Sequence, residues 1–395
     1  MFENIEWAPE DSILGLVESF KKDCNSRKID LGVGIYKDEQ GNSPVMHAVK
    51  KAETWLIHSE STKAYISAHG NTDYCYAVMR LVLGGEASLI KPSRVSITQT
   101  PGGTGALRVA AELIARKLHS KKVWVPDPTW ANHPDIFPAA GLELGRYPYV
   151  GVDGRMDFEG MIDSIKHMPE GDVLLLHACC HNPTGFDLSR SQWREVFEVV
   201  KARRLLPLID FAYQGFGSGL DDDAYCVRLM AENLSEVIIT HSCSKSFGIY
   251  RERTGSLMVV AGNSLQANSV RSQVALIVRQ IYSNPPSHGS LVVSEILKSS
   301  ELSSLWREEL DSMRSRIQYL RQLFLEAMSG HGLENKFRSV IEQRGMFSYT
   351  GLSPAQVRML RDNFSVYMVN TGRVNMAGMS QDNIPYLAKA IASVS

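Results

Sequence analysis

Short apolar runs alternate with helix-patterned segments between about residues 90 and 290, and this alternation constrains the fold most strongly. We expect strands at 95–99, 122–126, 172–180, 205–211, 236–242 and 255–260. Several of these runs are almost continuously apolar, as in strands that are covered on both faces. Helical spacing lies between them, for example at Trp193, Val196, Phe197 and Val200. The sequence therefore predicts an α/β fold in which helices sandwich a mostly parallel sheet.

The chain after about residue 310 has a different character. A long helix with Met313, Ile317, Leu320 and Phe324 on one stripe is expected to end at Gly330, and shorter mixed elements follow it. We therefore expect the chain to be organised as an N-terminal arm at 1–11, a small α+β domain formed by 12–44 with 311–395, and a large domain at 45–310.

Composition excludes several classes of protein. A formal net charge of −1 over 395 residues gives no electrostatic reason to expect binding to nucleic acid or to an anionic membrane. No window approaches the length of an apolar membrane span, and the first residues lack the layout of a signal peptide. The six cysteines show no metal-ligand spacing. We expect a cytoplasmic protein with no structural metal.

Two charged residues stand at the ends of expected buried strands. Asp210 ends the run "LLPLIDF", and Lys245 follows "EVIITHS" by three positions. A buried charge is costly without a partner, and in parallel sheets the carboxyl ends of the strands line the ligand crevice. A purely structural role is also open for each residue, namely helix capping by Asp210 and a simple salt bridge for Lys245.

Three further segments fall at strand ends. "PGGTG" places Gly103 and Thr104 at the start of an amphipathic helix, where free N–H groups can bind a phosphate. "HNPTG" places Asn182 after one strand, and Trp130 follows another. Taken singly, these could be structural turns and a core tryptophan. Together with Lys245 and Asp210 they supply what pyridoxal phosphate requires: an amine, a partner for the pyridine nitrogen, an aromatic plate and a phosphate seat.

Nine segments, in order, resemble the class I pyridoxal-phosphate aminotransferases of the aspartate and aromatic amino acid subgroup. They are "DLGVGIYKDEQGNSPV", "QTPGGTGALRVAAE", "VWVPDPTWANH", "ACCHNPTGFD", "DFAYQGF", "SCSKSFGIYRERTG", "VRQIYSNPPSHG", "GMFSYTGL" and "TGRVNMAGM". The resemblance covers nearly the whole chain. It implies the aspartate-aminotransferase fold, and exchange of an amino group between an L-amino acid (aspartate, glutamate or aromatic) and a 2-oxo acid such as 2-oxoglutarate.

The resemblance implies roles around the cofactor ring. Lys245 resembles the lysine that forms the Schiff base and moves the substrate proton. Asp210 resembles the partner of the pyridine nitrogen, and Trp130 resembles the stacking aromatic residue. Tyr213 and Asn182 resemble the residues bonded to the phenolic oxygen.

The resemblance also implies a phosphate cup and a shared dimer site. Gly103, Thr104, Ser242 and Arg253 resemble the phosphate ligands. Tyr65 resembles a tyrosine that reaches the phosphate of the neighbouring subunit, so a homodimer is expected.

Two arginines are implied in substrate choice. Arg373 resembles the residue that binds the α-carboxylate, and Arg279 resembles one that reaches from the partner subunit to a distal carboxylate. The remaining substrate contacts implied by the resemblance are Gly34, Asn182, Trp130 and Phe347.

The chain departs from the family pattern at His69, Ser246, Arg251 and Thr254. A specialised transaminase, which pairs glutamate and 2-oxoglutarate with a non-acidic amino acid such as arginine, is therefore the competing hypothesis. Less favoured hypotheses are an enzyme that keeps the cofactor but eliminates or decarboxylates, the ligand-sensing part of a regulator, and a cofactor-free aldolase that uses Lys245. Retention of Arg279 and Arg373 favours transamination of dicarboxylates.

Overall fold

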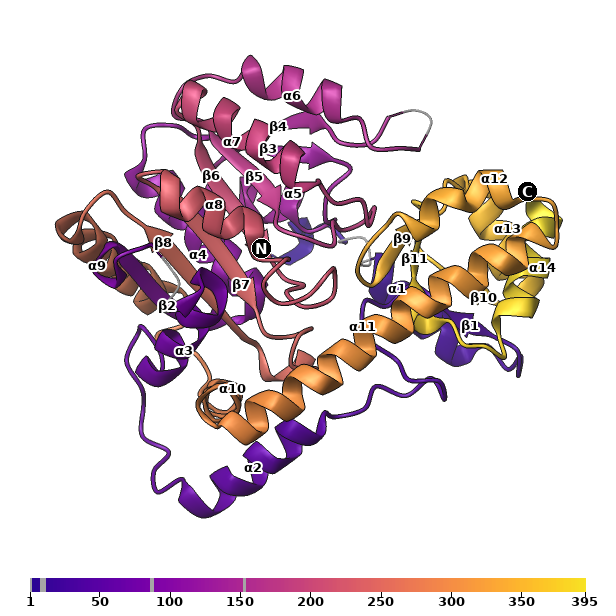
Figure 1. The fold of residues 1–395 in the computed structure, drawn as a ribbon, viewed down its shortest axis with the longest axis horizontal. Helices are drawn as coiled ribbons and strands as arrows, with labels where there is room; N and C mark the ends of the chain where they lie inside the picture. The colour runs from indigo at the N-terminus through magenta and orange to yellow at the C-terminus, as the bar shows by residue number, and fades with distance from the viewer. Residues whose placement is uncertain (1, 8–11, 86–88, 152–153) are drawn as a thin grey trace. The chain divides into compact units, whose positions relative to one another are not determined.

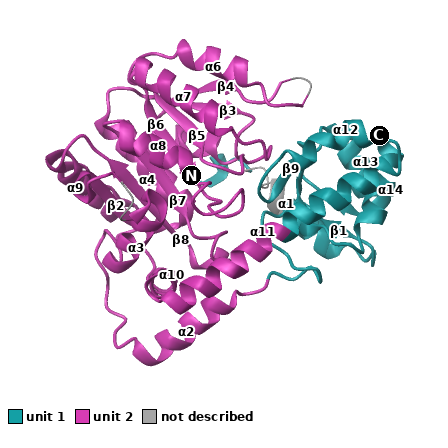
Figure 2. Ribbon diagram, viewed as in Figure 1, with its two compact units in different colours: residues 1–43, 316–395 teal, residues 44–315 magenta. Residues whose placement is uncertain are grey.

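The computed structural model describes residues 2–7, 12–85, 89–151 and 154–395 (Figure 1). The chain divides into two compact units (Figure 2). Unit 1 is formed by 1–43 with 316–395, and unit 2 by 44–315. Among the described residues, no helix has both the length and the apolar composition needed to cross a bilayer.

A seven-stranded sheet forms the centre of unit 2, in the order β2-β8-β7-β6-β5-β3-β4. Its strands are β2 (Val95–Pro101), β3 (Lys122–Asp127), β4 (Glu143–Pro148), β5 (Val173–His177), β6 (Leu206–Phe211), β7 (Val237–Ser242) and β8 (Thr254–Val260). Strand β8 is antiparallel to both of its neighbours, and the pairs from β7 to β4 are parallel. The carboxyl ends of β5, β6 and β7 therefore lie at one edge of the sheet.

Helices cover both faces of this sheet (Figure 1). Helices α4 (Gly102–Lys117) and α9 (Ser264–Ile281) pack on one face, where Leu107 and Ile277 join Leu208 and Ile238 in a buried apolar cluster. Helices α6 (Phe158–Lys166), α7 (Arg190–Arg203) and α8 (Tyr225–Asn233) lie across the other face. The described residues of this unit also form α2 (His47–Ser59), α3 (Thr72–Leu83), η3 (Pro92–Arg94), α5 (His133–Ile136), η4 (Pro138–Ala140), η5 (Tyr250–Glu252) and α10 (His288–Lys298).

Unit 1 contains two small sheets and several helices. Strands β1 (Ile29–Asp30) and β10 (Val366–Tyr367) pair in parallel, and β9 (Phe347–Tyr349) pairs antiparallel with β11 (Arg373–Asn375). The helices are η1 (Phe2–Asn4), α1 (Ser12–Lys22), α12 (Glu334–Phe337), η6 (Arg338–Ile341), α13 (Pro354–Phe364), η7 (Met376–Gly378) and α14 (Ile384–Val394). The long helix α11 (Ser300–Ser329) contributes its first part to unit 2 and its second part to unit 1.

The predicted fold class is confirmed, and all six predicted strands are present with shifted ends. Strand β4 is an addition to the prediction, because the edge sequence "ELGRYP" alternates polar and apolar residues and has no continuous apolar run. The expected N-terminal arm falls partly outside the described residues, which include only 2–7 of it. The domain boundaries stay a prediction.

Candidate active site

Strand register brings polar side chains together at the carboxyl edge of the sheet. His177 of β5 is paired with Asp210 of β6, and Asp210 is paired with Thr240 of β7. The preceding residues of these strands are almost entirely apolar and buried, because both faces are covered by helices. The polar residues therefore stand where the apolar interior ends.

Asp210 is a buried carboxylate with neighbours on both oxygens. Its Oδ2 lies 3.3 Å from His133 Nε2, and its Oδ1 lies 3.4 Å from Thr240 Oγ1. Burial alone would raise the pKa of Asp210, but His133, His177 and the hydrogen bond from Thr240 together outweigh burial and hold the pKa below its usual value. The ionised carboxylate keeps lone pairs for a further N–H donor.

Three histidines that the sequence pattern did not single out, His133, His177 and His181, form a chain of contacts that begins at Asp210. Thr129 Oγ1 bridges His133 Nδ1 at 2.8 Å and His177 Nε2 at 3.2 Å, and the centre of the His177 ring lies 4.2 Å from that of His181. Burial, together with His133, lowers the pKa of His177 to about 3. The sequence did hold a sign of His177, because this residue ends an apolar run as Asp210 does. However, burying a neutral histidine costs less than burying a charge, so its position at a strand end attracts less notice.

Lys245 lies in the turn that follows β7, beside two tyrosine rings. Its Nζ is 4.8 Å from the ring centre of Tyr250 and 5.9 Å from that of Tyr213. Both rings present π faces that favour a cationic amine. The sequence singled out Tyr213 but not Tyr250.

The glycine-rich start of α4 forms a close-fitting cradle. A Cβ on Gly103 would lie 3.2 Å from Ser242 Cβ, and one on Gly102 would lie 2.6 Å from Arg253 Nη2. A Cβ on Gly255, the β8 partner of Ser242, would lie 2.6 Å from the Gly102 backbone. Gly255 lies too close to the Gly102 backbone to carry a side chain, and Gly102 has a φ of +71°, so these glycines let the helix approach the strands this closely. No described side chain caps this helix end, so its first N–H groups are available to an anion, beside Ser242 and Arg253.

Two further predicted cofactor contacts in unit 2, Trp130 and Asn182, lie in the same neighbourhood. The Trp130 ring packs edge-on against His133, with ring centres 5.3 Å apart, and His133 in turn contacts Asp210. Asn182 is buried in the turn after β5, next to His181. An amine, an ionised carboxylate, an aromatic ring and an anion cradle thus surround one strand edge. This set fits pyridoxal phosphate.

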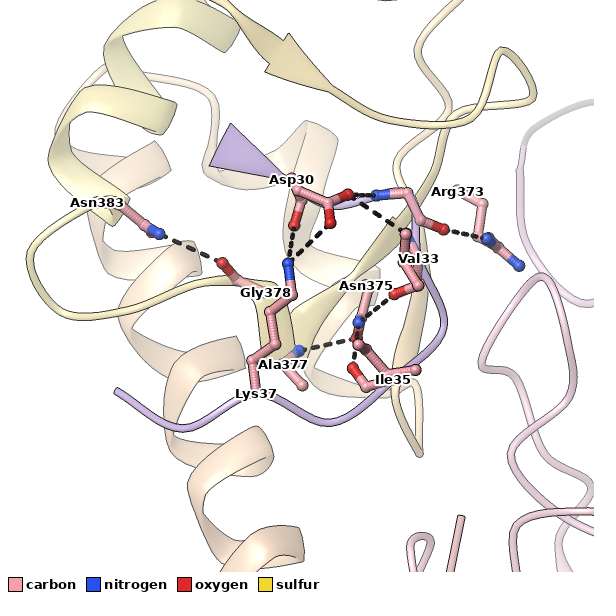
Figure 3. Close-up of polar contacts among 10 residues, drawn as sticks. Asp30, Val33, Ile35, Lys37, Arg373, Asn375, Ala377, Gly378 and Asn383 are labelled. Atoms are coloured by element: carbon pink, nitrogen blue, oxygen red, sulfur yellow. Dashed lines mark hydrogen bonds and ion pairs between the residues drawn. The ribbon is translucent and has the colours of Figure 1, made fainter. Parts of the chain in front are cut away.

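Three predicted substrate residues form a second cluster within unit 1. Arg373 is buried, its Nη2 donates to Gly32 O at 2.5 Å, and its guanidinium lies 4.3 Å from the centre of the Phe347 ring. A Cβ on Gly34 would lie only 2.8 Å from Phe347 Cζ. Figure 3 shows Arg373 beside the segment that contains Val33. Arg373, Phe347 and the segment around Gly34 therefore form one packed group.

Two predicted residues lie away from these clusters on the surface of unit 2. Tyr65 is 95% exposed, and Arg279 is exposed at the end of α9, where it contacts Ser283 Oγ. His69 lies in the turn before α3, and its Nδ1 is 3.1 Å from Thr98 Oγ1 of β2. Thr254 and Ser246 are buried: Thr254 lies in β8, and the backbone carbonyl of Ser246 accepts from Trp306 Nε1.

Within the described residues, one group has ligand atoms close enough for a metal, namely Cys179, Cys180 and Asp223. The Asp223 carboxylate already accepts three backbone N–H bonds, from Gly215, Gly217 and Ser218. Burial raises the pKa of Cys179 well above its usual value, which opposes the thiolate that a metal needs. We assign no metal to this group.

Comparison with known proteins decides the family. The model of the family "Aminotransferase class I and II" matches residues 26–391. The chain belongs to this family. It is 51% identical to an aromatic-amino-acid aminotransferase of Pseudomonas aeruginosa over 100% of this chain and 98% of the relative. It is 45% identical to an aspartate aminotransferase of Escherichia coli over the full length of both.

A solved structure agrees with this assignment. The aromatic-amino-acid aminotransferase of Burkholderia pseudomallei, covalently bound to pyridoxal phosphate, superposes with a TM-score of 0.97 at 42% identity, covering 100% of this chain and 99% of that one. The predictions of an aminotransferase of the aspartate and aromatic type, and of pyridoxal phosphate as its cofactor, are confirmed.

Proposed function

We propose that this aminotransferase exchanges amino groups between aspartate, glutamate or aromatic L-amino acids and 2-oxo acids such as 2-oxoglutarate. The observation that carries the proposal is the cluster at the strand edge of unit 2, where Lys245, Asp210 and the start of α4 lie around the ends of β6 and β7. One relative, 45% identical, is named for aspartate, and another, 51% identical, is named for aromatic amino acids. These two names support the proposed substrate range.

Each residue at the strand edge has a proposed task. Pyridoxal phosphate supplies an aldehyde that links to an amine and a ring that withdraws electrons. Lys245 Nζ would hold this aldehyde and, after the substrate amine replaces it, move the substrate Cα proton. Asp210 would accept a bond from the ring N–H, for which its low pKa suits it. Trp130 would stack on the ring.

The remaining contacts would bind the phenolic oxygen and the phosphate of pyridoxal phosphate. Tyr213 and Asn182 would bond the phenolic oxygen. The phosphate would take the N–H groups of Gly103 and Thr104, with Ser242 and Arg253. Trp130 and Asn182 would also contact the substrate.

Two arginines would select the substrate. Arg373 would bind the α-carboxylate that every amino acid carries, since a guanidinium fork matches a carboxylate in two hydrogen bonds. Arg279 would bind the distal carboxylate of aspartate or glutamate. Gly34 and Phe347 would line the substrate pocket. An aromatic substrate has no distal carboxylate, so it would depend on Arg373 and not on Arg279.

We propose that the working unit is a homodimer in which Tyr65 and Arg279 complete the partner's site. The near-complete exposure of Tyr65, the exposure of Arg279, and exposed apolar side chains on α2 and α9, among them Trp55 and Leu276, support this arrangement. We also propose a cytoplasmic location. Its support is a relative from Oryza sativa named as cytoplasmic, together with six cysteines that form no disulfide among the described residues.

The dimer proposal is tested by mixing two variants that turn over aspartate poorly. Lys245→Ala lacks the amine, and Arg279→Ala lacks the arginine that the partner would supply. After the subunits are exchanged at equal amounts, half of the dimers are hybrids with one complete site, so about a quarter of wild-type aspartate activity is expected. No recovery, with subunit exchange shown by mass spectrometry, would mean that Arg279 serves its own chain.

The substrate proposal is tested by single-turnover absorbance scans of the purified holoenzyme. Aspartate, glutamate, phenylalanine, tyrosine and arginine are mixed one at a time with the enzyme, and conversion of the cofactor band is followed. Fast conversion by both acidic and aromatic amino acids is expected. Conversion by glutamate and a single non-acidic amino acid would instead support the specialised transaminase, and no cofactor band after reconstitution would contradict the proposed function.

A further inference from the structure

The segment from Leu31 to Ile35 has no regular secondary structure, yet its backbone polar groups are almost all bonded. Leu31 N donates to Tyr367 O at 2.8 Å, and Leu31 O accepts from Asn375 N at 2.8 Å. Ile35 N donates to Val33 O at 3.0 Å. A loop bonded this completely has one preferred conformation, because any other would leave buried polar groups without partners.

Asn375 of β11 supplies the largest share of these bonds. Its Nδ2 donates to Val33 O at 2.6 Å and to Ile35 O at 2.7 Å (Figure 3). Its Oδ1 accepts from Ala377 N at 3.0 Å, and the residue is 0% exposed. The two carbonyls flank Gly34, so one buried amide fixes the backbone on both sides of this glycine.

Asp30 anchors the other end of the segment. Its Oδ1 accepts from Gly32 N at 3.0 Å, and its Oδ2 forms an ion pair with Lys37 Nζ at 2.8 Å (Figure 3). The two side chains are only 12% and 15% exposed, so solvent screens the pair weakly. The ion pair joins Asp30, the residue just before the segment, to Lys37, two positions beyond its end.

The 31–35 segment, which contains Gly34, touches the other two proposed substrate-binding residues of unit 1. Gly32 O accepts from Arg373 Nη2, and Gly34 packs against the Phe347 ring, which itself lies under the Arg373 guanidinium. Arg373 and Asn375 are two residues apart on β11, and Asn375 pairs with Phe347 of β9. Displacing the segment would therefore remove one of the contacts that orient the Arg373 guanidinium.

We infer that Asn375 and the Asp30–Lys37 pair are positioning residues that set how tightly this enzyme binds the α-carboxylate of every substrate. The inference rests on the proposed role of Arg373. Both Asn375 and Asp30 act through the 31–35 segment and not on the reacting atoms. The α-carboxylate is bound equally well in the ground state and in the transition state. Weaker binding of this group therefore raises KM and leaves kcat unchanged.

The first test is Asn375→Asp, which keeps the size of the side chain and replaces the Nδ2 donor by an oxygen facing two carbonyls. KM for aspartate and for phenylalanine should rise together by about tenfold or more, with kcat changed less than about threefold. An equal rise for both substrates distinguishes this effect from that of Arg279, which concerns acidic substrates alone. Wild-type KM values in a folded variant would overturn the inference.

The milder variant Asp30→Asn keeps an acceptor for Gly32 N and removes the charge opposite Lys37. It should raise KM for both substrates by roughly threefold to tenfold, and adding Lys37→Met should bring little further loss, because the two residues act as a pair. Independent losses from Asp30→Asn and Lys37→Met would contradict the pairing.

A matched control separates positioning from general destabilisation. Gln356 of α13 also bonds backbone groups in unit 1, namely Ser353 N and Val394 O, and both of these lie outside the 31–35 segment. Gln356→Ala should lower the melting temperature and leave KM unchanged. If Gln356→Ala raises KM as much as Asp30→Asn does, the positioning role is wrong. Turnover of aspartate and phenylalanine by the parent enzyme shows separately that the proposed function holds.

Discussion

The two clusters of candidate site residues are built in different ways. In unit 2, Asp210 and Thr240 lie at the ends of paired strands and Lys245 follows the second of these strands, so regular sheet register sets their relative positions. In unit 1, Arg373 and Phe347 are held by the three-residue pair β9–β11 and by side-chain bonds to an irregular segment. The first cluster relies on backbone ladders, whereas the second relies on individual side chains such as Asn375.

This difference predicts how the clusters respond to substitution. The strand-edge cluster should tolerate loss of a functional side chain without loss of fold, because the ladder remains. The unit 1 cluster should lose geometry when a supporting side chain changes.

Lys245→Ala should have the largest effect, with kcat lowered at least about a thousandfold, because both the covalent hold and the proton carrier are lost. Circular dichroism should be that of the wild type. Turnover within tenfold of the wild type would mean that another residue carries the chemistry.

Arg373→Ala and Arg279→Ala should differ in selectivity. Arg373→Ala should lower kcat/KM for aspartate and phenylalanine alike by about a hundredfold or more, since a bidentate charge-assisted pair is lost. Arg279→Ala should lower kcat/KM for aspartate by about tenfold to a hundredfold and leave phenylalanine within about threefold. Equal losses for both substrates in Arg279→Ala would contradict its role as the distal-carboxylate residue.

Acid should destabilise the two units unequally. Unit 2 contains His177 and His241, buried in the sheet, whose pKa values are lowered by burial to about 3 and about 4. Both are neutral when folded and take up a proton when unfolded below about pH 6.5, so stability is lost as the pH falls from 6.5 toward 3, at up to about 1.4 kcal/mol per pH unit for each histidine. The one histidine of unit 1, His331, is exposed.

Hydrogen exchange at pH 7 and pH 5, read by mass spectrometry, checks this prediction. Protection should fall more in β6 and β7 than in β9 and β11. His241 is a suitable control position, because neither ring nitrogen has a hydrogen-bond partner among the described residues and the Phe211 ring packs against it. His241→Phe should reduce the acid sensitivity of unit 2 and leave activity at pH 7 unchanged. An equal loss of protection in both units, unchanged by His241→Phe, would contradict the burial of neutral histidines as the cause.

The strand-edge cluster could be predicted because its determinants are local in sequence. A charged residue that ends an apolar run, such as Asp210, marks a strand end, and parallel strands place such ends at one edge. His133 could not be placed in this way, because it follows a loop and only the fold brings it to Asp210. The residues that hold the segment beside Arg373 could not be predicted either. Asn375 and Val33, which are joined by a hydrogen bond, lie 342 positions apart in the sequence. Strand β4 could not be predicted because its sequence has no continuous apolar run.

The measurement that tests the central claim most directly is borohydride reduction of the holoenzyme followed by peptide mass spectrometry. Reduction makes the link between pyridoxal phosphate and its lysine permanent, so the modified residue can be read from the peptide mass. We predict modification of Lys245, and none in Lys245→Ala. Modification of another lysine, or no modification after reconstitution with the cofactor, would contradict the assignment of the strand edge of unit 2 as the active site.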